Sequence, residues 1–415
     1  MISFMRAEAR WLFAGFLLTT FSGFGQTFFI SLSNTALRTR FDLTHGELGL
    51  AYAVATLASA LILLEFGKIV DHVSTRRAAL IVALGLTAAC LVMALADAVW
   101  MLVLAFLGLR LFGQGMMGQV AMVAVGRWYE ANRGRAVSLV SLGYPAGEAV
   151  LPSLAVAAMA LFGDRSIWFM GAGAVSLLAM PLLFVLLAQD RTPQAAHPDV
   201  PLATPRVASP PIPWRRRDVL GELSFYGMLA GVLCPAFMMT GLFFHQLHLV
   251  EIKGWTPAHF ALGFTAFAVT QVVSGLISGA LVDRFSARVM LPVYLVPMAL
   301  GLLLAAALSG PWVVFALMVL IGLTGGAAST VMGAIWPELF GPAHLGEIRA
   351  LSFSAMVASS AASPLITGFL IDGGIPFPTQ LAAMGAFALL ACGLMVLIQP
   401  RLDAIASGKV SPRPV

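Results

Sequence analysis

Hydrophobic residues dominate this chain in long uninterrupted stretches, and short polar or charged segments separate one stretch from the next. Each stretch, wound as a helix, is long enough to cross about 30 Å of hydrocarbon. Tryptophans lie at or beside several of the ends, which interfacial aromatic side chains prefer. The pattern predicts an all-α membrane protein with twelve transmembrane helices, at approximately 11–33, 46–67, 77–97, 100–127, 135–162, 166–188, 220–249, 257–282, 288–309, 311–336, 349–371 and 378–399.

The composition supports a membrane protein. Of 415 residues, 60% are hydrophobic and 10% are charged, against about 25% charged in soluble domains. A chain this apolar needs the bilayer as its solvent. The three cysteines all lie inside apolar stretches, which predicts small core residues rather than a disulfide framework or metal cluster. The first stretch has no compact signal-peptide pattern, so we expect it to be the first spanning helix.

Lys and Arg are distributed unevenly between alternate connections. If the N-terminus is cytoplasmic, 19 of 24 lie on the cytoplasmic side and four lie outside, while Arg110 is inside a helix. Positive residues concentrate on the cytoplasmic side of membrane proteins. We therefore expect a multi-pass protein of the cytoplasmic (inner) membrane with both termini in the cytoplasm.

The chain divides near its middle. Residues 189–218 contain seven prolines, end close to Arg215-Arg216-Arg217 and lack helical periodicity, as in a linker beside anionic headgroups. We expect an N-terminal six-helix bundle at 1–188, this cytoplasmic linker, and a C-terminal six-helix bundle with a short tail at 219–415.

A charged turn occurs twice. The turn that starts at Gly67 and ends at Arg77 returns at Gly279, 212 positions later (279 minus 67), and the same offset relates Gly113 to Gly325. Repeats at half the chain length predict two pseudo-symmetric bundles with a cavity between them near the midplane.

The two turns resemble the signature Gly-x-Leu-Ala-Asp-Arg-x-Gly-Arg-Arg of the major facilitator superfamily, although serine replaces the inner glycine in both copies. The resemblance implies transport by alternating access. Asp71 and Asp283 could form a latch that pairs with arginines and opens during transport, or could act as fixed helix caps. The predicted cytoplasmic gate comprises Gly67, Asp71, Arg76, Arg77, Gly279, Asp283, Arg284 and Arg288.

Two charged residues lie deep in predicted helices. Arg110 lies about 15 Å along its helix from Trp100, and Glu148 lies about 20 Å from Arg135 on the next helix. A charge at a helix centre costs about 2.5–3.5 kcal/mol, so such residues usually have a partner or a role. One hypothesis is a buried structural ion pair. The other is a site where an anionic substrate competes for Arg110 and Glu148 carries a proton.

Further motifs point the same way. The segment Arg110–Gly115 resembles the family's helix-four motif, which implies proton or substrate coupling, and Arg127-Trp128-Tyr129 is similar to the monocarboxylate and oxalate/formate branch. The resemblance to this branch makes a small organic anion the first expectation for the substrate. The branch's cationic residues in helices eight and eleven are absent here, which disfavours a dicarboxylate. The full predicted substrate and proton site comprises Arg110, Glu148, Gln26, Tyr144, His245 and Gln271.

The sequence disfavours other classes of protein. It has no phosphate-binding Gly-x-x-x-x-Gly-Lys-Ser/Thr loop and no hydrolase constellation, which argues against an ATP-driven pump or an enzyme. We expect no cofactor, no metal and no nucleic-acid partner, and a monomer that binds a small solute and protons in a lipid bilayer. Two alternatives stay open, namely proton-driven efflux of hydrophobic compounds and a sensor built on a transporter fold.

Overall fold

The computed structural model describes residues 2–129, 132–189, 214–341 and 343–410, and every regular element in these ranges is a helix. Two compact units divide the chain. Unit 1 comprises Met1–Leu202 together with Phe243–His248, and unit 2 comprises Ala203–Leu242 and Leu249–Val415. Residues 190–213, which form most of the predicted linker, lie outside the described residues.

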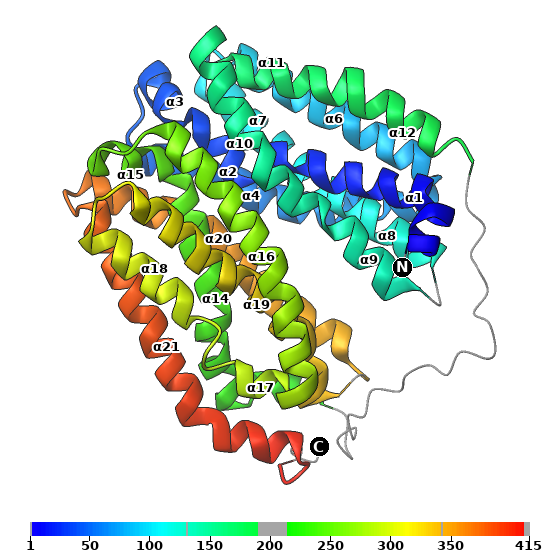
Figure 1. Cartoon of the computed structure of the whole chain (residues 1–415), viewed down its shortest axis with the longest axis vertical. Coiled ribbons are helices and arrows are strands. Elements are labelled where there is room, and N and C mark those ends of the chain that lie inside the picture. The colour runs from blue at the N-terminus through cyan, green and yellow to red at the C-terminus, as the bar shows by residue number, and fades with distance from the viewer. Residues whose placement is uncertain (1, 130–131, 190–213, 342, 411–415) are drawn as a thin grey trace. The chain divides into compact units, whose positions relative to one another are not determined.

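Unit 1 begins with a broken helix and continues through five further spans. Thr44 and Glu47 form a capping box that starts α4, and the Ser74 hydroxyl accepts the Arg77 N–H at the start of α6. In Figure 1, α6 runs beside α11 and α12, and α1 packs on α10. The elements are α1 (Ile2–Phe21), η1 (Ser22–Gly25), α2 (Thr27–Ile30), η2 (Ser31–Ser33), α3 (Asn34–Phe41), α4 (His45–Phe66), α5 (Ile69–His72), α6 (Thr75–Leu95), α7 (Val99–Gly108), η3 (Leu109–Met117), α8 (Gly118–Trp128), α9 (Arg133–Ser141), α10 (Gly143–Phe162), α11 (Ser166–Gly173), η4 (Ala174–Ala179) and α12 (Met180–Leu186).

Unit 2 contains longer, mostly uninterrupted helices. Thr256 caps α16, and α16 lies along α19 with α18 between α19 and α21 (Figure 1). An added Cβ at Gly326 of α19 would lie 2.6 Å from the Gly275 nitrogen of α16, so glycine permits this close crossing. The elements are α13 (Arg216–Leu220), α14 (Leu223–Phe244), α15 (Gln246–Lys253), α16 (Pro257–Phe285), α17 (Ala287–Met290), α18 (Val296–Ala307), α19 (Trp312–Phe340), α20 (Leu345–Asp372) and α21 (Phe377–Ala406).

The described residues contain ten helices that are long and apolar enough to span a bilayer. A bent pair, Glu8–Gly25 with Thr27–Phe41, adds an eleventh span, and the short apolar helix α18 occupies the remaining predicted position. These helices fit the predicted fold of twelve transmembrane helices, and the division into six spans per half stays a prediction.

Three spans differ from the prediction in form. The first helix, expected at 11–33, bends by 46° and continues to Phe41. The span expected at 288–309 is divided into α17 and α18, because Pro292 and Pro297 remove backbone donors there. The span expected at 220–249 is interrupted at His245, between α14 and α15.

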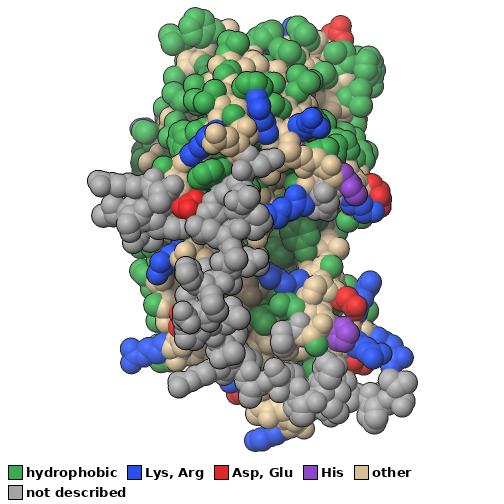
Figure 2. Space-filling view, turned by 90° about the vertical axis from the view of Figure 1, so that its right-hand side faces the viewer, with side chains coloured by type: hydrophobic (Ala, Val, Ile, Leu, Met, Phe, Trp, Pro, Cys, Tyr) green, Lys and Arg blue, Asp and Glu red, His purple; other side chains and the backbone are tan. Residues whose placement is uncertain are grey.

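Large hydrophobic side chains cover much of the outer surface of the spans. Leu61, Leu177, Leu276 and Leu397 are each more than two-thirds exposed. Figure 2 shows broad areas of hydrophobic side chains on one face, with Lys and Arg confined to parts of it. Exposed apolar surface on this scale is typical of helices that face lipid.

Candidate functional site

The first span of unit 1 is interrupted where it crosses the fourth span. Gln26 has an extended backbone (φ −83°, ψ 152°) between η1 and α2. A side chain on Gly25 would collide with the Leu109 carbonyl oxygen, and its Cβ would lie 2.7 Å from the Gly113 Cα. Leu109 and Gly113 belong to η3, which is a π-helical segment. Broken helices and π-helical turns both occur frequently at functional sites in helical proteins.

Arg110 lies in this π-helical segment and is only 6% exposed. Its guanidinium carbon lies 5.3 Å from the centroid of the Tyr52 ring, and its buried Nε and Nη1 atoms have no hydrogen-bond acceptor. The Tyr52 hydroxyl shares a 2.7 Å hydrogen bond with Thr27, beside the break at Gln26. An aromatic face stabilises a cation, but it satisfies no N–H donor. The arrangement can therefore accept an anion at Arg110.

Glu148 lies on α10, which packs closely on α1 through glycine. A Cβ on Gly147 would lie 2.8 Å from the Thr20 carbonyl oxygen. The Glu148 Oε2 atom is buried without a hydrogen-bond partner, and within the described residues Glu148 forms no ion pair with Arg110. One turn earlier, the Tyr144 hydroxyl contacts Gly118 at the start of α8. The structural ion pair considered from sequence is thus not formed in this structure.

The segment Phe243–His248 groups with unit 1 and is held there by buried amides. The Asn34 side chain donates to the Phe244 carbonyl at 2.6 Å. The fully buried Gln246 side chain donates to the Phe28 carbonyl at 2.8 Å and to the Ser31 hydroxyl at 2.7 Å. These contacts reach the turns that follow the break in the first span. Neither amide is among the site residues predicted from the sequence.

His245 is buried in a small histidine cluster rather than beside Arg110. The His45 ring centroid lies 5.6 Å from that of His245 and 4.4 Å from that of His248. Within the described residues no three His, Cys, Asp or Glu side chains form a group that could hold a metal ion. His245 and His248 are three positions apart, which brings helical residues to one face, whereas His45 comes from a distant part of the chain.

Gln271 belongs to unit 2, where the equivalent of Arg110 is Gly322. The Gln271 Oε1 atom is buried without a partner against α19. A Cβ on Gly322 would lie 2.7 Å from the Phe267 carbonyl oxygen, so the crossing leaves no room for a side chain. This close contact explains why the charged centre has no counterpart in the second half.

The first copy of the gate turn is held through its backbone. Gln119 donates to the Gly67 carbonyl at 3.2 Å, and Arg127 donates to the Val70 carbonyl at 2.8 Å. Arg76 lies over the Phe184 ring, with 3.6 Å between its guanidinium carbon and the centroid, and Arg77 is exposed. Asp71 lies in α5, but its side chain is outside the described part of the structure. The pairing predicted for Asp71 stays a prediction.

The second copy uses different carboxylates from those predicted. Arg288 forms ion pairs with Glu338 (3.0 Å) and Asp403 (3.1 Å), and Glu338 also accepts the Ala287 N–H at 2.8 Å. Asp283 is exposed and forms no ion pair with any described residue, while Arg284 lies over the Phe285 ring. The expected partner of Arg288 was Asp283, so this pairing is corrected. The charged ends of α19 and α21 were the signal available in the sequence.

The structure therefore defines a polytopic α-helical membrane protein of two compact units, with unpaired charged atoms buried inside one of them. The chain matches the Major Facilitator Superfamily over residues 15–256 and 228–414. It belongs to this family, which confirms the resemblance drawn from the gate motif.

Solved structures and one curated relative are similar to this chain. A bacterial homologue of the human lysosomal transporter Spinster, in an inward-facing and unoccupied conformation, gives a TM-score of 0.69 at 14% identity and covers 97% of this chain and 96% of its own. A peptide transporter gives 0.71 at 14% identity, with 95% and 94% covered. The multidrug resistance protein MdtH of Photorhabdus laumondii is 29% identical over 148 residues, which span 35% of this chain and about a third (36%) of that relative.

Proposed function

We propose that this protein is a secondary transporter for a small organic anion, such as a monocarboxylate, and that protons drive it. The observation that carries the proposal is Arg110, a buried guanidinium with two unsatisfied N–H donor positions in a membrane-spanning segment. A carboxylate would accept hydrogen bonds from this planar group in a geometry that lysine cannot reproduce. The Tyr52 ring holds the cation from one side and leaves its donors for the anion.

Glu148 supplies the proton step in this proposal. Its buried, unpartnered carboxyl group is costly to leave ionised in the absence of a cation partner. An anion bound at Arg110 moves together with a proton on Glu148, which limits the net charge carried across the membrane. Gln26, at the break in the first span, and Tyr144, on α10, belong to the proposed site, whereas the binding roles of His245 and Gln271 stay predictions.

Flux in proteoliposomes tests this function. We expect uptake of at least one radiolabelled monocarboxylate, accelerated by an imposed proton gradient. Glu148→Gln should remove the acceleration but retain exchange, and Arg110→Lys should weaken substrate binding roughly ten-fold or more because charged hydrogen bonds are lost. The exposed residues Glu65 and Arg165 provide matched controls, since Glu65→Gln and Arg165→Lys should transport normally.

Three results would contradict parts of the proposal. Full proton-driven transport by a normally folded Glu148→Gln protein would exclude Glu148 from coupling. Specific binding without flux in either direction would indicate a sensor. The unfolding temperature could fall in each single variant and recover when Arg110 and Glu148 are both replaced by apolar residues. That result would leave the two residues only a structural role.

A second candidate function is proton-driven efflux of hydrophobic compounds. The similarity to a multidrug resistance protein over part of the chain favours it. Gradient-dependent export of ethidium from the same proteoliposomes, with no carboxylate flux, would establish this function in place of anion transport.

A further inference from the structure

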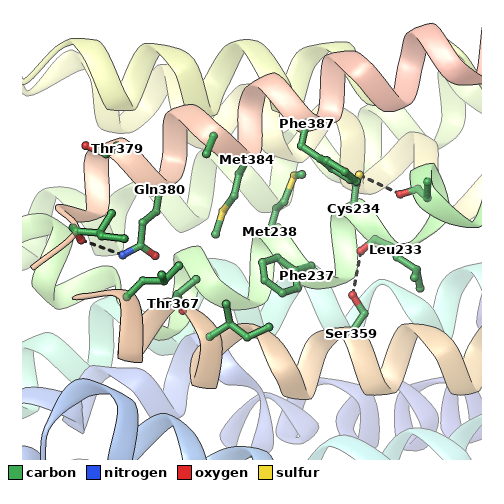
Figure 3. Close-up of a pocket in the computed structure, with 15 residues that line it drawn as sticks. Leu233, Cys234, Phe237, Met238, Ser359, Thr367, Thr379, Gln380, Met384 and Phe387 are labelled. Carbon is green, nitrogen blue, oxygen red and sulfur yellow. Dashed lines mark hydrogen bonds between the residues drawn. The ribbon is translucent and has the colours of Figure 1, made fainter. Parts of the chain in front are cut away.

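Unit 2 contains a cavity of about 600 Å³ that takes no part in the charged site. It lies between α14, α20 and the first turns of α21 (Figure 3). A volume of this size is within the range of pockets that enclose drug-sized ligands. Its lining residues belong to unit 2, whereas Arg110 and Glu148 belong to unit 1, so the inference goes beyond the proposed function.

The walls of the cavity are almost entirely apolar. Phe237, Met238 and Met384 form its inner surface, and Phe387 and Ile366, which are about half exposed, lie at its rim. None of the described side chains that line it carries a charge. An ionic group would lose its hydration without gaining a partner there. The rim residues are apolar and about half exposed, as are many side chains on the outer surface of the spans, which fits a cavity that opens toward the bilayer.

One polar atom in the cavity has no partner. Gln380 is only 5% exposed, and its Nε2 donates a hydrogen bond to the Ile375 carbonyl at 3.1 Å. Its Oε1 is buried without a hydrogen-bond partner and, in Figure 3, lies on the side of the two methionines. The Thr367 and Ser359 hydroxyls each already make a hydrogen bond, since they donate to the Ser363 and Leu233 carbonyls. Among the described lining side chains, the Gln380 Oε1 is therefore the buried polar atom that makes no hydrogen bond at all.

We propose that this cavity binds a neutral single-chain amphiphile of the bilayer, of the monoacylglycerol class. Its chain lies against Phe237 and the two methionines, whose unbranched side chains adapt to a ligand. Its hydroxyl donates to the Gln380 Oε1, which otherwise pays the cost of an unsatisfied buried acceptor. The absence of charge among the described lining residues selects a neutral headgroup over a phosphate or a carboxylate.

The test uses the whole protein in phosphatidylcholine nanodiscs and tritiated 1-monomyristoylglycerol as the probe. We expect saturable binding, with methyl myristate competing about five-fold more weakly because it has no hydroxyl donor. Gln380→Leu should abolish this difference between the two lipids. Ala383→Phe, which fills the cavity from α21, should abolish binding of both.

Matched variants on the same helix separate the site from the fold. Gln399 also has a buried, unpartnered Oε1 but lies outside the cavity, and Ala386 is exposed without lining it. Gln399→Leu and Ala386→Phe should bind as the unmodified protein does. Absence of saturable binding, or unchanged binding to a folded Ala383→Phe protein, overturns the proposal. Either result leaves carboxylate flux unaffected, so the two proposals fail independently.

Discussion

Two buried charged side chains, Glu222 and Arg110, differ in whether the protein supplies them with hydrogen-bond partners. Glu222 receives two hydrogen bonds from Arg401, at 3.1 and 2.9 Å, and these join the start of α14 to the end of α21. Arg110 faces only an aromatic ring and keeps two buried nitrogens without acceptors. Removing the partner of a paired buried charge destabilises a fold, and a buried charge that has no partner is costly unless a ligand completes it. This contrast supports a structural role for Glu222 and the ligand-binding role that we propose for Arg110.

The Glu222 pair makes stability depend on pH. The hydrogen bond from Arg401 is the main cause that lowers the pKa of Glu222 below its usual value. Stabilisation is therefore fully present above the ordinary glutamate pKa of about 4.3 and is lost as the pH falls through the lower folded-state pKa. We expect Glu222→Gln to lower the free energy of unfolding at pH 7 by about 1 kcal/mol, a modest value because Arg401 is half exposed.

Thermal unfolding in detergent between pH 7 and pH 3 measures this effect. The unmodified protein should unfold at a higher temperature than Glu222→Gln at pH 7, and this difference should disappear near pH 3. Glu65→Gln, at an exposed pair with Lys68, should unfold like the unmodified protein throughout. Equal unfolding temperatures of Glu222→Gln and the unmodified protein at pH 7 would contradict the assignment.

At the scale of elements, short helices depend on contacts from distant helices. Helix α17 has only four residues, and its first N–H is capped by Glu338 from α19 while Arg288 is held by Glu338 and Asp403. An isolated helix of this length is unstable in water. The ends of α19 and α21 therefore position the second gate turn.

We expect Glu338→Gln to reduce transport and lower the unfolding temperature more than Asp283→Asn does. The reason is that Glu338 both caps α17 and pairs with Arg288, whereas Asp283 is exposed.

Asp71→Asn, in the first copy of the gate turn, should impair transport more than it impairs membrane insertion. Initial flux rates, normalised to folded protein in the membrane, give the comparison. A greater loss in Asp283→Asn than in Glu338→Gln would show that the exposed aspartate acts in another conformation.

For the molecule as a whole, charge distribution predicts orientation. Lys and Arg lie in alternate connections, 19 of 24 of them on one side under the proposed topology. We propose that both termini are cytoplasmic and that the protein resides in the inner membrane. In a bacterial host, a C-terminal green fluorescent protein should fluoresce, and a C-terminal alkaline phosphatase should be inactive. Active phosphatase fused at the C-terminus would reverse the orientation.

Sequence by itself determined the class of protein, because the bilayer imposes a local rule. A span must be apolar over about 20 residues and must satisfy its own backbone, so most spans could be located without knowing their neighbours. The repeat at 212 positions predicted six spans in each half, and the gate motif predicted the family. The cost of burying charge identified Arg110 and Glu148 as exceptional.

Tertiary structure alone decided how those residues are partnered. The first span breaks at Gln26 because Gly25 meets Gly113 of a helix far along the chain. Arg110 lies over the Tyr52 ring and does not pair with Glu148. Arg288 pairs with Glu338 and Asp403 and not with Asp283. Hydrophobicity is a property of each segment, whereas a contact between side chains depends on which helices are adjacent and how they are rotated. That information is distributed over the whole chain, so no local pattern contains it.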